Sequence, residues 1–177
     1  AADKKLCKLA LAEKRPFLLI GSPMCRVFSK MMQLNRSKYS DEEFKQMVDD
    51  AIEHMRFVVE LYHEQEARGC IWLHEHPRGA WSWTLDFMVK LLEQPTTLKV
   101  ESDMCPYGMG TYDFDGEWRL VLKGTGWATN SKHVAAAVSL RCSNRGAPLE
   151  DRHLHATLWN GKAKKCEVYP PKLVRDI

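Results

Sequence analysis

The stretch Cys70-Ile71-Trp72-Leu73-His74-Glu75-His76-Pro77 decides the fold. Its first four residues form an apolar run of strand length, and a polar cluster that ends in proline follows them. A short apolar run bounded by turn signals is typical of a strand that is buried inside a sheet. We therefore predict a buried strand over residues 70–73, with the polar side chains of residues 74–77 at its carboxyl end.

Amphipathic helices are predicted on both sides of this strand. Ser40 and Glu43 form a capping box, and apolar residues then recur at spacings of three and four over residues 44–62. Gly69 ends this helix. A second apolar stripe predicts a helix over residues 81–92.

Shorter segments complete the pattern. The sequence predicts strands over residues 16–20, 96–101, 118–122 and 154–159, a helix over 131–140 and a last helical turn from residue 170. Alternating strands and helices predict an α/β fold with a Rossmann-like, mostly parallel sheet and flanking helices. Ligands of such sheets bind beyond the carboxyl ends of the strands. Two polar clusters, residues 21–29 and 74–79, follow predicted strands in this way.

The composition excludes several protein classes. The chain has 177 residues, of which 45% are hydrophobic and 28% charged, so it can bury a core and is neither disordered nor a coiled coil. A net charge of +3 does not by itself indicate nucleic-acid binding. No apolar run approaches the roughly 18 residues of a membrane span. Six scattered cysteines without a Cys-x-x-Cys pair favour an intracellular, reducing compartment.

Cys25 and Glu75 are the candidate catalytic residues. Cys25 follows a Gly-Ser-Pro turn, precedes a predicted helix and has Arg26 beside it. A helix start and a neighbouring cation lower the pKa of a thiol, which would make Cys25 a nucleophile. The alternative is a small hydrophobic residue in a tight turn. Glu75 could act as a general acid or anchor a polar ring, and the alternative is an exposed loop glutamate.

A metal site is a further candidate. Its residues would be Cys142, His153, His155 and Cys166, since cysteine and histidine are the ligands of structural zinc. In a strand, His153 and His155 would share one face. Their spacing matches no standard zinc finger, however. We therefore expect separate surface histidines rather than zinc.

Several segments resemble DNA cytosine-5 methyltransferases. Gly21–Ser29, which contains Pro23-Met24-Cys25, resembles the Pro-Cys nucleophile loop of that family. Leu73–Gly79 is similar to its strand that ends in Glu-Asn, with His76 in place of the asparagine. Asp103–Gly108, Lys123–Asn130 and Tyr169–Ile177 resemble later segments of phage-type members, in the same order. Similar segments occur in retrotransposon-like polyproteins.

The resemblance implies a chemistry and a set of site residues. In that family the cysteine thiolate adds to carbon 6 of a flipped-out cytosine, the glutamate contacts the ring nitrogen and exocyclic amine, and carbon 5 takes a methyl group from S-adenosylmethionine. Cys25 and Glu75 would take these roles. The resemblance also implies cofactor contacts at Pro23 and Asn130. The implied DNA contacts are Ser29, Lys30, Arg78 and Lys123.

The sequence also departs from that family. The first predicted strand is preceded only by residues 1–15, which contain no Gly-rich turn, and the chain begins at Ala1. We therefore expect the cofactor-binding strands to be missing. The expected organisation is an N-terminal extension (1–15), a methyltransferase-like α/β domain (16–140) and a basic C-terminal tail packed on it (141–177).

Two functions remain open at this point. The first is methyl transfer to cytosine, provided that another chain supplies the missing half. The second is a non-catalytic descendant that serves as a structural or interaction subunit of a larger assembly. Both predict a protein partner or an oligomer that covers the incomplete sheet.

Overall fold

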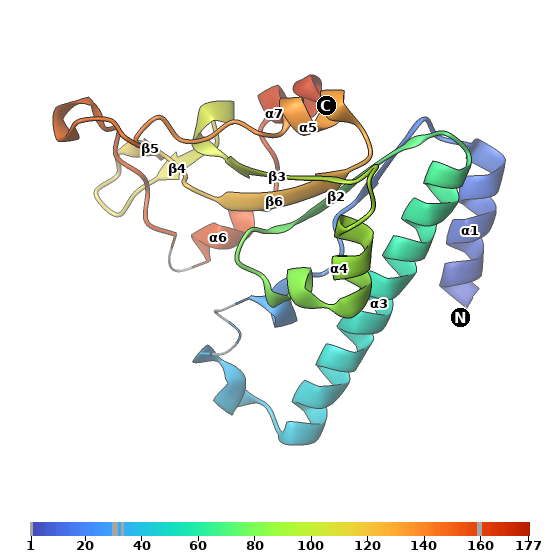
Figure 1. Ribbon diagram of the computed structural model, residues 1–177. Helices are drawn as coiled ribbons and strands as arrows, with labels where there is room; N and C mark the ends of the chain where they lie inside the picture. The colour runs from blue at the N-terminus through green and yellow to red at the C-terminus, as the bar shows by residue number, and fades with distance from the viewer. Residues whose placement is uncertain (1, 30–31, 33, 159–160) are drawn as a thin grey trace.

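A four-stranded sheet forms the centre of the molecule (Figure 1). The computed structural model describes residues 2–29, 32, 34–158 and 161–177. The strand order is β1-β2-β6-β3. These strands are β1 (Leu18–Gly21), β2 (Ile71–Pro77), β6 (Gly124–Thr129) and β3 (Leu98–Asp103).

The sheet is mixed, so the prediction of a mostly parallel sheet is wrong, whereas the α/β class is confirmed. β1 and β2 are parallel, but β6 is antiparallel to both of its neighbours. The sequence pattern did not show β6 because its six residues include two glycines, which are depleted in strands. Gly126 has a packing reason: an added Cβ would lie 2.8 Å from the Trp83 ring.

One face of the sheet is covered by α3 (Asp41–Ala67) and α4 (Asp86–Leu92) (Figure 1). The capping box at Ser40 is confirmed, because the Ser40 side chain accepts from the Glu43 N–H and Glu43 accepts in return. The predicted helix over 81–92 is divided into a 3₁₀ turn, η3 (Trp81–Thr84), and α4, with an extended residue between them. A core of aromatic, methionine and small aliphatic side chains fills this layer.

The opposite face is covered by α5 (Lys132–Ala137), α7 (Pro171–Asp176) and the 3₁₀ turn η4 (Cys105–Tyr107) (Figure 1). Leu73 and Trp127 of the sheet pack there with Leu173 of α7, which is fully buried. The C-terminal residues therefore contribute to the core.

The remaining elements lie at the periphery. The predicted strand near residue 118 forms a separate hairpin, in which β4 (Gly110–Tyr112) pairs with β5 (Trp118–Leu120). Within the predicted strand 154–159, His155 makes a single bridge to Leu120, and residue 159 lies outside the described residues. The other short elements are η1 (Arg26–Phe28), η2 (Arg36–Lys38), η5 (Leu149–Asp151) and α6 (Lys162–Lys165).

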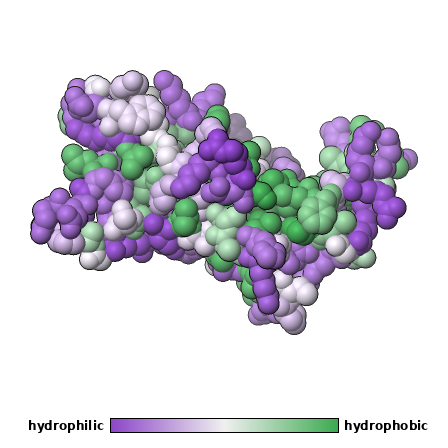
Figure 2. Space-filling model, turned by 90° about the horizontal axis from the view of Figure 1, so that it is seen from above, coloured by the Kyte–Doolittle hydropathy of each residue, from purple (hydrophilic) through white to green (hydrophobic). Residues whose placement is uncertain are grey.

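The N-terminal residues form α1 (Ala2–Lys14), which lies beside α3 (Figure 1). Lys4 and Lys8 pair with glutamates of α3, and exposed ion pairs of this kind contribute little stability. No helix in the described part of the chain is both long and apolar enough to cross a bilayer. Seen from above, hydrophobic residues reach the surface in separate groups between hydrophilic ones (Figure 2).

Candidate functional site

The strand directions bring three segments that are distant in the sequence to one end of the sheet. β1 and β2 are parallel, so their carboxyl ends lie together, and the amino end of the antiparallel β6 joins them. Here lies a cavity of about 390 Å³. Its lining residues are Ser22, Pro23, Met24, Cys25, Arg26, Glu75, Pro77, Lys123, Ala163, Glu167 and Tyr169. The structure thus brings Cys25 and Glu75 into one cavity.

Glu75 is held at the wall of this cavity. It is only 7% exposed, so the alternative of an exposed loop glutamate is wrong. The Ser22 hydroxyl donates a hydrogen bond to its carboxylate. Because side chains alternate along a strand, Glu75 faces away from His74 and His76 and toward the layer that contains α7. A buried carboxylate in this position can accept hydrogen bonds from a bound polar ring.

The thiol of Cys25 is half-buried and precedes η1. Burial raises the pKa of the Cys25 thiol, the charge of Glu75 raises it further, and Lys123 opposes these effects. The prediction of a lowered thiol pKa is therefore wrong. Its physical reason is that η1 has only three residues, too few for a strong helix dipole to offset desolvation. Cys25 is a protonated thiol at rest and must lose its proton before it can act as a nucleophile.

Tyr169 and Lys123 close the cavity from the C-terminal side. The Lys123 Nζ atom donates to the backbone oxygen of Cys166 over 3.2 Å and lies 4.4 Å from the centre of the Tyr169 ring. Burial, the charge of Glu75 and a hydrogen bond to Glu75 raise the pKa of Tyr169. Tyr169 therefore stays a protonated donor beside the carboxylate.

The sequence prediction missed Tyr169 as a site residue. The C-terminal segment reaches the cavity through tertiary packing, which no local sequence pattern predicts. The available signal was Tyr169-Pro170-Pro171, since a proline in the first turn of a helix fixes where the chain enters α7.

Two buried histidines support the loop from the other face of β2. His74 Nδ1 lies 2.9 Å from the Tyr62 hydroxyl, and His76 Nδ1 lies 2.6 Å from the Ser82 hydroxyl. Burial lowers the pKa of His74 to about 3 and that of His76 to about 4, so both rings are neutral at pH 7. The backbone of Pro23 and Met24 lies against His76 and offsets part of its shift. The histidines therefore form a neutral support beneath the cysteine loop.

Gly21 allows α3 to pack closely against β1. An added Cβ at Gly21 would lie 1.9 Å from the Tyr62 hydroxyl, far inside van der Waals contact. The last residue of β1 must therefore be glycine for Tyr62 to reach His74.

Of the two implied cofactor contacts, Pro23 lines the cavity and Asn130 does not. The Asn130 side chain accepts from the Trp72 N–H and donates to the Cys70 carbonyl, both over 3.0 Å. It lies at the opposite end of the sheet because β6 is antiparallel to β2, so the residue after β6 meets the start of β2. The structure therefore does not bring Pro23 and Asn130 together.

The implied DNA contacts are also dispersed. Lys123 lines the cavity. Arg78 pairs with the buried Asp103 over 2.9 Å, and Ser29 donates to the Arg26 carbonyl over 2.8 Å. Lys30 lies outside the described residues. Lys123 is therefore the residue of this set that the structure places at the cavity.

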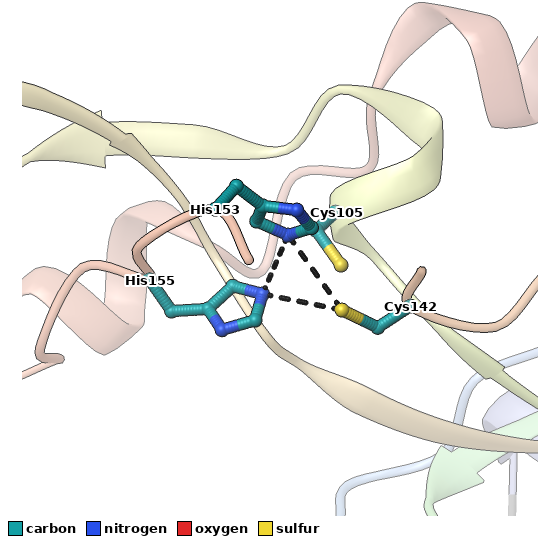
Figure 3. Close-up of side chains that lie close together, drawn as sticks. All are labelled: Cys105, Cys142, His153 and His155. Atoms are coloured by element: carbon teal, nitrogen blue, oxygen red, sulfur yellow. Dashed lines mark hydrogen bonds between the residues drawn. The ribbon is translucent and has the colours of Figure 1, made fainter. Parts of the chain in front are cut away.

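Three of the four candidate metal ligands lie close together, and a different cysteine takes the place of the fourth. The expectation of separate surface histidines is wrong, because His153 and His155 are half-buried and their Nε2 atoms lie 2.9 Å apart. Cys142 lies beside them, and their fourth neighbour is Cys105 rather than Cys166 (Figure 3). Cys166 is buried in the second core instead. Cys105 was not predicted because it enters through a tertiary contact: the Cys142 N–H donates to Asp103, which ends β3 just before η4.

Comparisons with protein-family models, with curated proteins and with solved structures found no match. The cavity and the cysteine–histidine cluster are therefore the features of this molecule from which a function can be inferred.

Proposed function

We propose that this chain is a DNA cytosine-5 methyltransferase-like domain whose cavity binds an unpaired cytosine and adds the Cys25 thiol to it. The observation that carries the proposal is that Cys25 and Glu75, which the resemblance pairs, line one cavity. The volume of about 390 Å³ falls within the ordinary range for small-ligand sites. β1, α3 and β2 form a parallel pair with a helical crossover, which also fits this descent.

Each polar group has a role in this proposal. The Glu75 carboxylate accepts from the exocyclic amine of cytosine and shares a proton with the ring nitrogen. The hydroxyls of Ser22 and Tyr169 hold that carboxylate in place. Lys123 supplies a positive charge near the bound nucleotide, where a phosphate would sit.

The reaction that these residues support is a reversible addition. The Cys25 thiol gives its proton to water, and its sulfur forms a bond to carbon 6 of the ring. The electron pair of the C5–C6 double bond moves onto carbon 5 as the ring nitrogen takes a proton through Glu75. Carbon 5 then takes a proton from water. Loss of a proton from carbon 5, cleavage of the C–S bond and return of the ring-nitrogen proton through Glu75 regenerate the cytosine and a thiolate. The thiolate takes a proton back from water, so atoms and electrons balance.

Of the two residues that the resemblance assigns to S-adenosylmethionine, Pro23 lines the cavity and Asn130 does not. Both amide atoms of Asn130 are used by the backbone of β2 and its preceding residue, away from the cavity. We therefore derive no methyl-transfer step, which would need a donor site on another polypeptide segment.

Base selectivity tests the proposed binding mode. Cytosine carries an amine where thymine carries a carbonyl oxygen, so Glu75 should favour cytosine. We expect short single-stranded oligonucleotides of cytosine to bind about tenfold more tightly than those of thymine, as measured by calorimetry, since a charged hydrogen bond contributes about 1.5–3 kcal/mol. Glu75→Gln should remove the preference, and Glu167→Gln, which also lies at the cavity, should keep it. Equal binding of both bases by the unmodified chain would contradict the proposal.

One observation favours the interaction subunit as a second candidate function. Among the described residues, β1 pairs with β2 alone. Phe17, which precedes β1, and Ile20, within β1, are 73% and 53% exposed. An open strand edge with apolar neighbours can pair with another polypeptide. Light scattering over a range of concentrations tests this candidate. A dimer that Ile20→Lys dissociates would support it, and a monomer at all concentrations would argue against self-association.

A further inference from the structure

We propose that Cys105, Cys142, His153 and His155 bind a structural zinc ion. The thiol and imidazole atoms of these four side chains all lie within 4.8 Å of one another. Figure 3 shows that Cys105, Cys142 and the neighbouring pair His153 and His155 come from different parts of the chain and point into one space. This site is independent of the cavity that contains Cys25.

The spacing of the ligand atoms approaches that of a tetrahedral zinc site. Zinc bonds of about 2.3 Å to sulfur and about 2.0 Å to nitrogen give edges of about 3.5 Å between sulfur and nitrogen and about 3.3 Å between nitrogens. Cys142 Sγ lies 3.6 Å from His153 Nε2 and 3.5 Å from His155 Nε2. The two Nε2 atoms are 2.9 Å apart. Small side-chain movements are therefore sufficient to surround an ion.

The donor set selects zinc. Two thiols and two imidazoles are borderline-soft ligands, which suit zinc and not magnesium or calcium. Cys105 and Cys142 are each 4% exposed, and the histidines are half-buried. Four protein ligands leave no position for substrate or water, so the site is structural rather than catalytic.

The backbone around the ligands is already fixed. The Asn144 amide pairs with His153 in both directions, accepting from its N–H over 3.0 Å and donating to its carbonyl over 2.8 Å. The Cys142 N–H donates to Asp103 over 3.0 Å, and the Ala156 N–H after His155 donates to the Leu120 carbonyl over 2.8 Å. Ligands held in this way lose little conformational entropy when an ion binds.

The ion would stabilise a part of the chain that has little regular structure. Between α5 and α6, the described residues form only η5 and the bridge at His155. Zinc would tie this segment to η4 and thereby to β3. Cross-linking of this kind is how metals stabilise segments with small cores.

Metal analysis of the purified protein tests the proposal. We expect stoichiometric zinc by mass spectrometry, and cobalt substitution should give the visible and charge-transfer bands of tetrahedral cobalt–thiolate coordination. Cys142→Ser and His155→Gln should lose the metal. Cys166→Ser is the matched control, because Cys166 is equally buried but lies in the second core, and it should keep the metal.

Two results would contradict the proposed zinc site. A folded, reduced protein that takes up neither zinc nor cobalt stoichiometrically would overturn the proposal. Equal metal loss in Cys166→Ser and Cys142→Ser would also overturn it. If Cys142→Ser does not fold, the cobalt spectrum of the unmodified chain still decides, because thiolate bands require a cysteine ligand.

Discussion

The Ser22 hydroxyl donates a hydrogen bond to the carboxylate of Glu75, although the two residues are 53 positions apart in the sequence. This contact joins the loop after β1 to the end of β2. Because Cys25 lies on the same loop, the bond also fixes the thiol relative to the carboxylate. The geometry of the proposed site therefore depends on Ser22.

Replacing Ser22 should weaken both stability and base selectivity. Ser22→Ala leaves the buried Glu75 carboxylate with one hydrogen-bond donor fewer, so we expect the free energy of unfolding to fall by about 1–2 kcal/mol. Urea denaturation measures this change. Ser37→Ala, at an exposed position, should have no effect. Equal stability of both variants would show that the Ser22 contact does not hold the loop.

The reactivity of Cys25 should reflect its raised pKa. A raised pKa means a smaller thiolate fraction at neutral pH than in a free cysteine in solution, so iodoacetamide should modify Cys25 more slowly than free cysteine. Glu75→Gln removes a negative charge and should speed the modification, whereas Lys123→Met removes a positive charge and should slow it. Peptide mass spectrometry measures both rates. A faster reaction at Cys25 than with free cysteine near pH 7 would contradict the argument.

The buried histidines should make the fold sensitive to acid. Their pKa values fall from 6.5 to about 3 and about 4 on folding, so between roughly pH 6 and pH 4 the unfolded chain binds protons that the folded chain does not. Stability is therefore complete above the unfolded pKa and falls as the pH decreases, by up to about 1.4 kcal/mol per histidine and pH unit.

Denaturant unfolding between pH 4 and pH 7 measures this dependence. His76→Gln should make the slope shallower than in the unmodified chain. His63→Gln, at an exposed position on α3, is the control and should keep the slope. An unchanged slope in His76→Gln would show that His76 is not buried in its neutral form.

Gly21 should not tolerate a side chain. Gly21→Ala places a methyl group against the Tyr62 hydroxyl, and overpacking of this kind costs about 1–3 kcal/mol. Gly79→Ala meets no atom within 4 Å and serves as the control. Thermal unfolding compares the two, and Tyr62→Phe in the Gly21→Ala background should restore part of the loss. A destabilisation as large in Gly79→Ala would point to a general effect of losing glycine.

The sequence predicted the local features better than the sheet. The capping box at Ser40 follows from neighbouring residues and is confirmed. Cys25 and Glu75 line one cavity, as strand polarity predicts, but the predicted strand over residues 70–73 continues to Pro77, so Glu75 lies within β2 and not beyond its end. β6 was missed because its glycines are used for packing against Trp83, which only the tertiary structure shows. That omission also produced the expectation of a mostly parallel sheet.

Site residues that arrive from distant segments could not be predicted. Tyr169 reaches the cavity because α7 packs on the sheet through Leu173. Cys105 joins Cys142 because Asp103 binds the Cys142 backbone. Neither contact has a local sequence pattern, since each depends on the packing of two segments that are far apart in the chain.

Hydrogen exchange at carbon 5 of cytosine tests the central claim most directly, because it requires the addition of a thiol to carbon 6 but no methyl donor. A single-stranded oligonucleotide is incubated with the protein in deuterated water, and mass spectrometry measures deuterium at carbon 5. We predict exchange above the protein-free rate with the unmodified chain and with Cys70→Ser, whose half-buried cysteine lies outside the cavity, and no such excess with Cys25→Ser. Exchange at the protein-free rate with the unmodified chain, or equal exchange with Cys25→Ser, would contradict the claim.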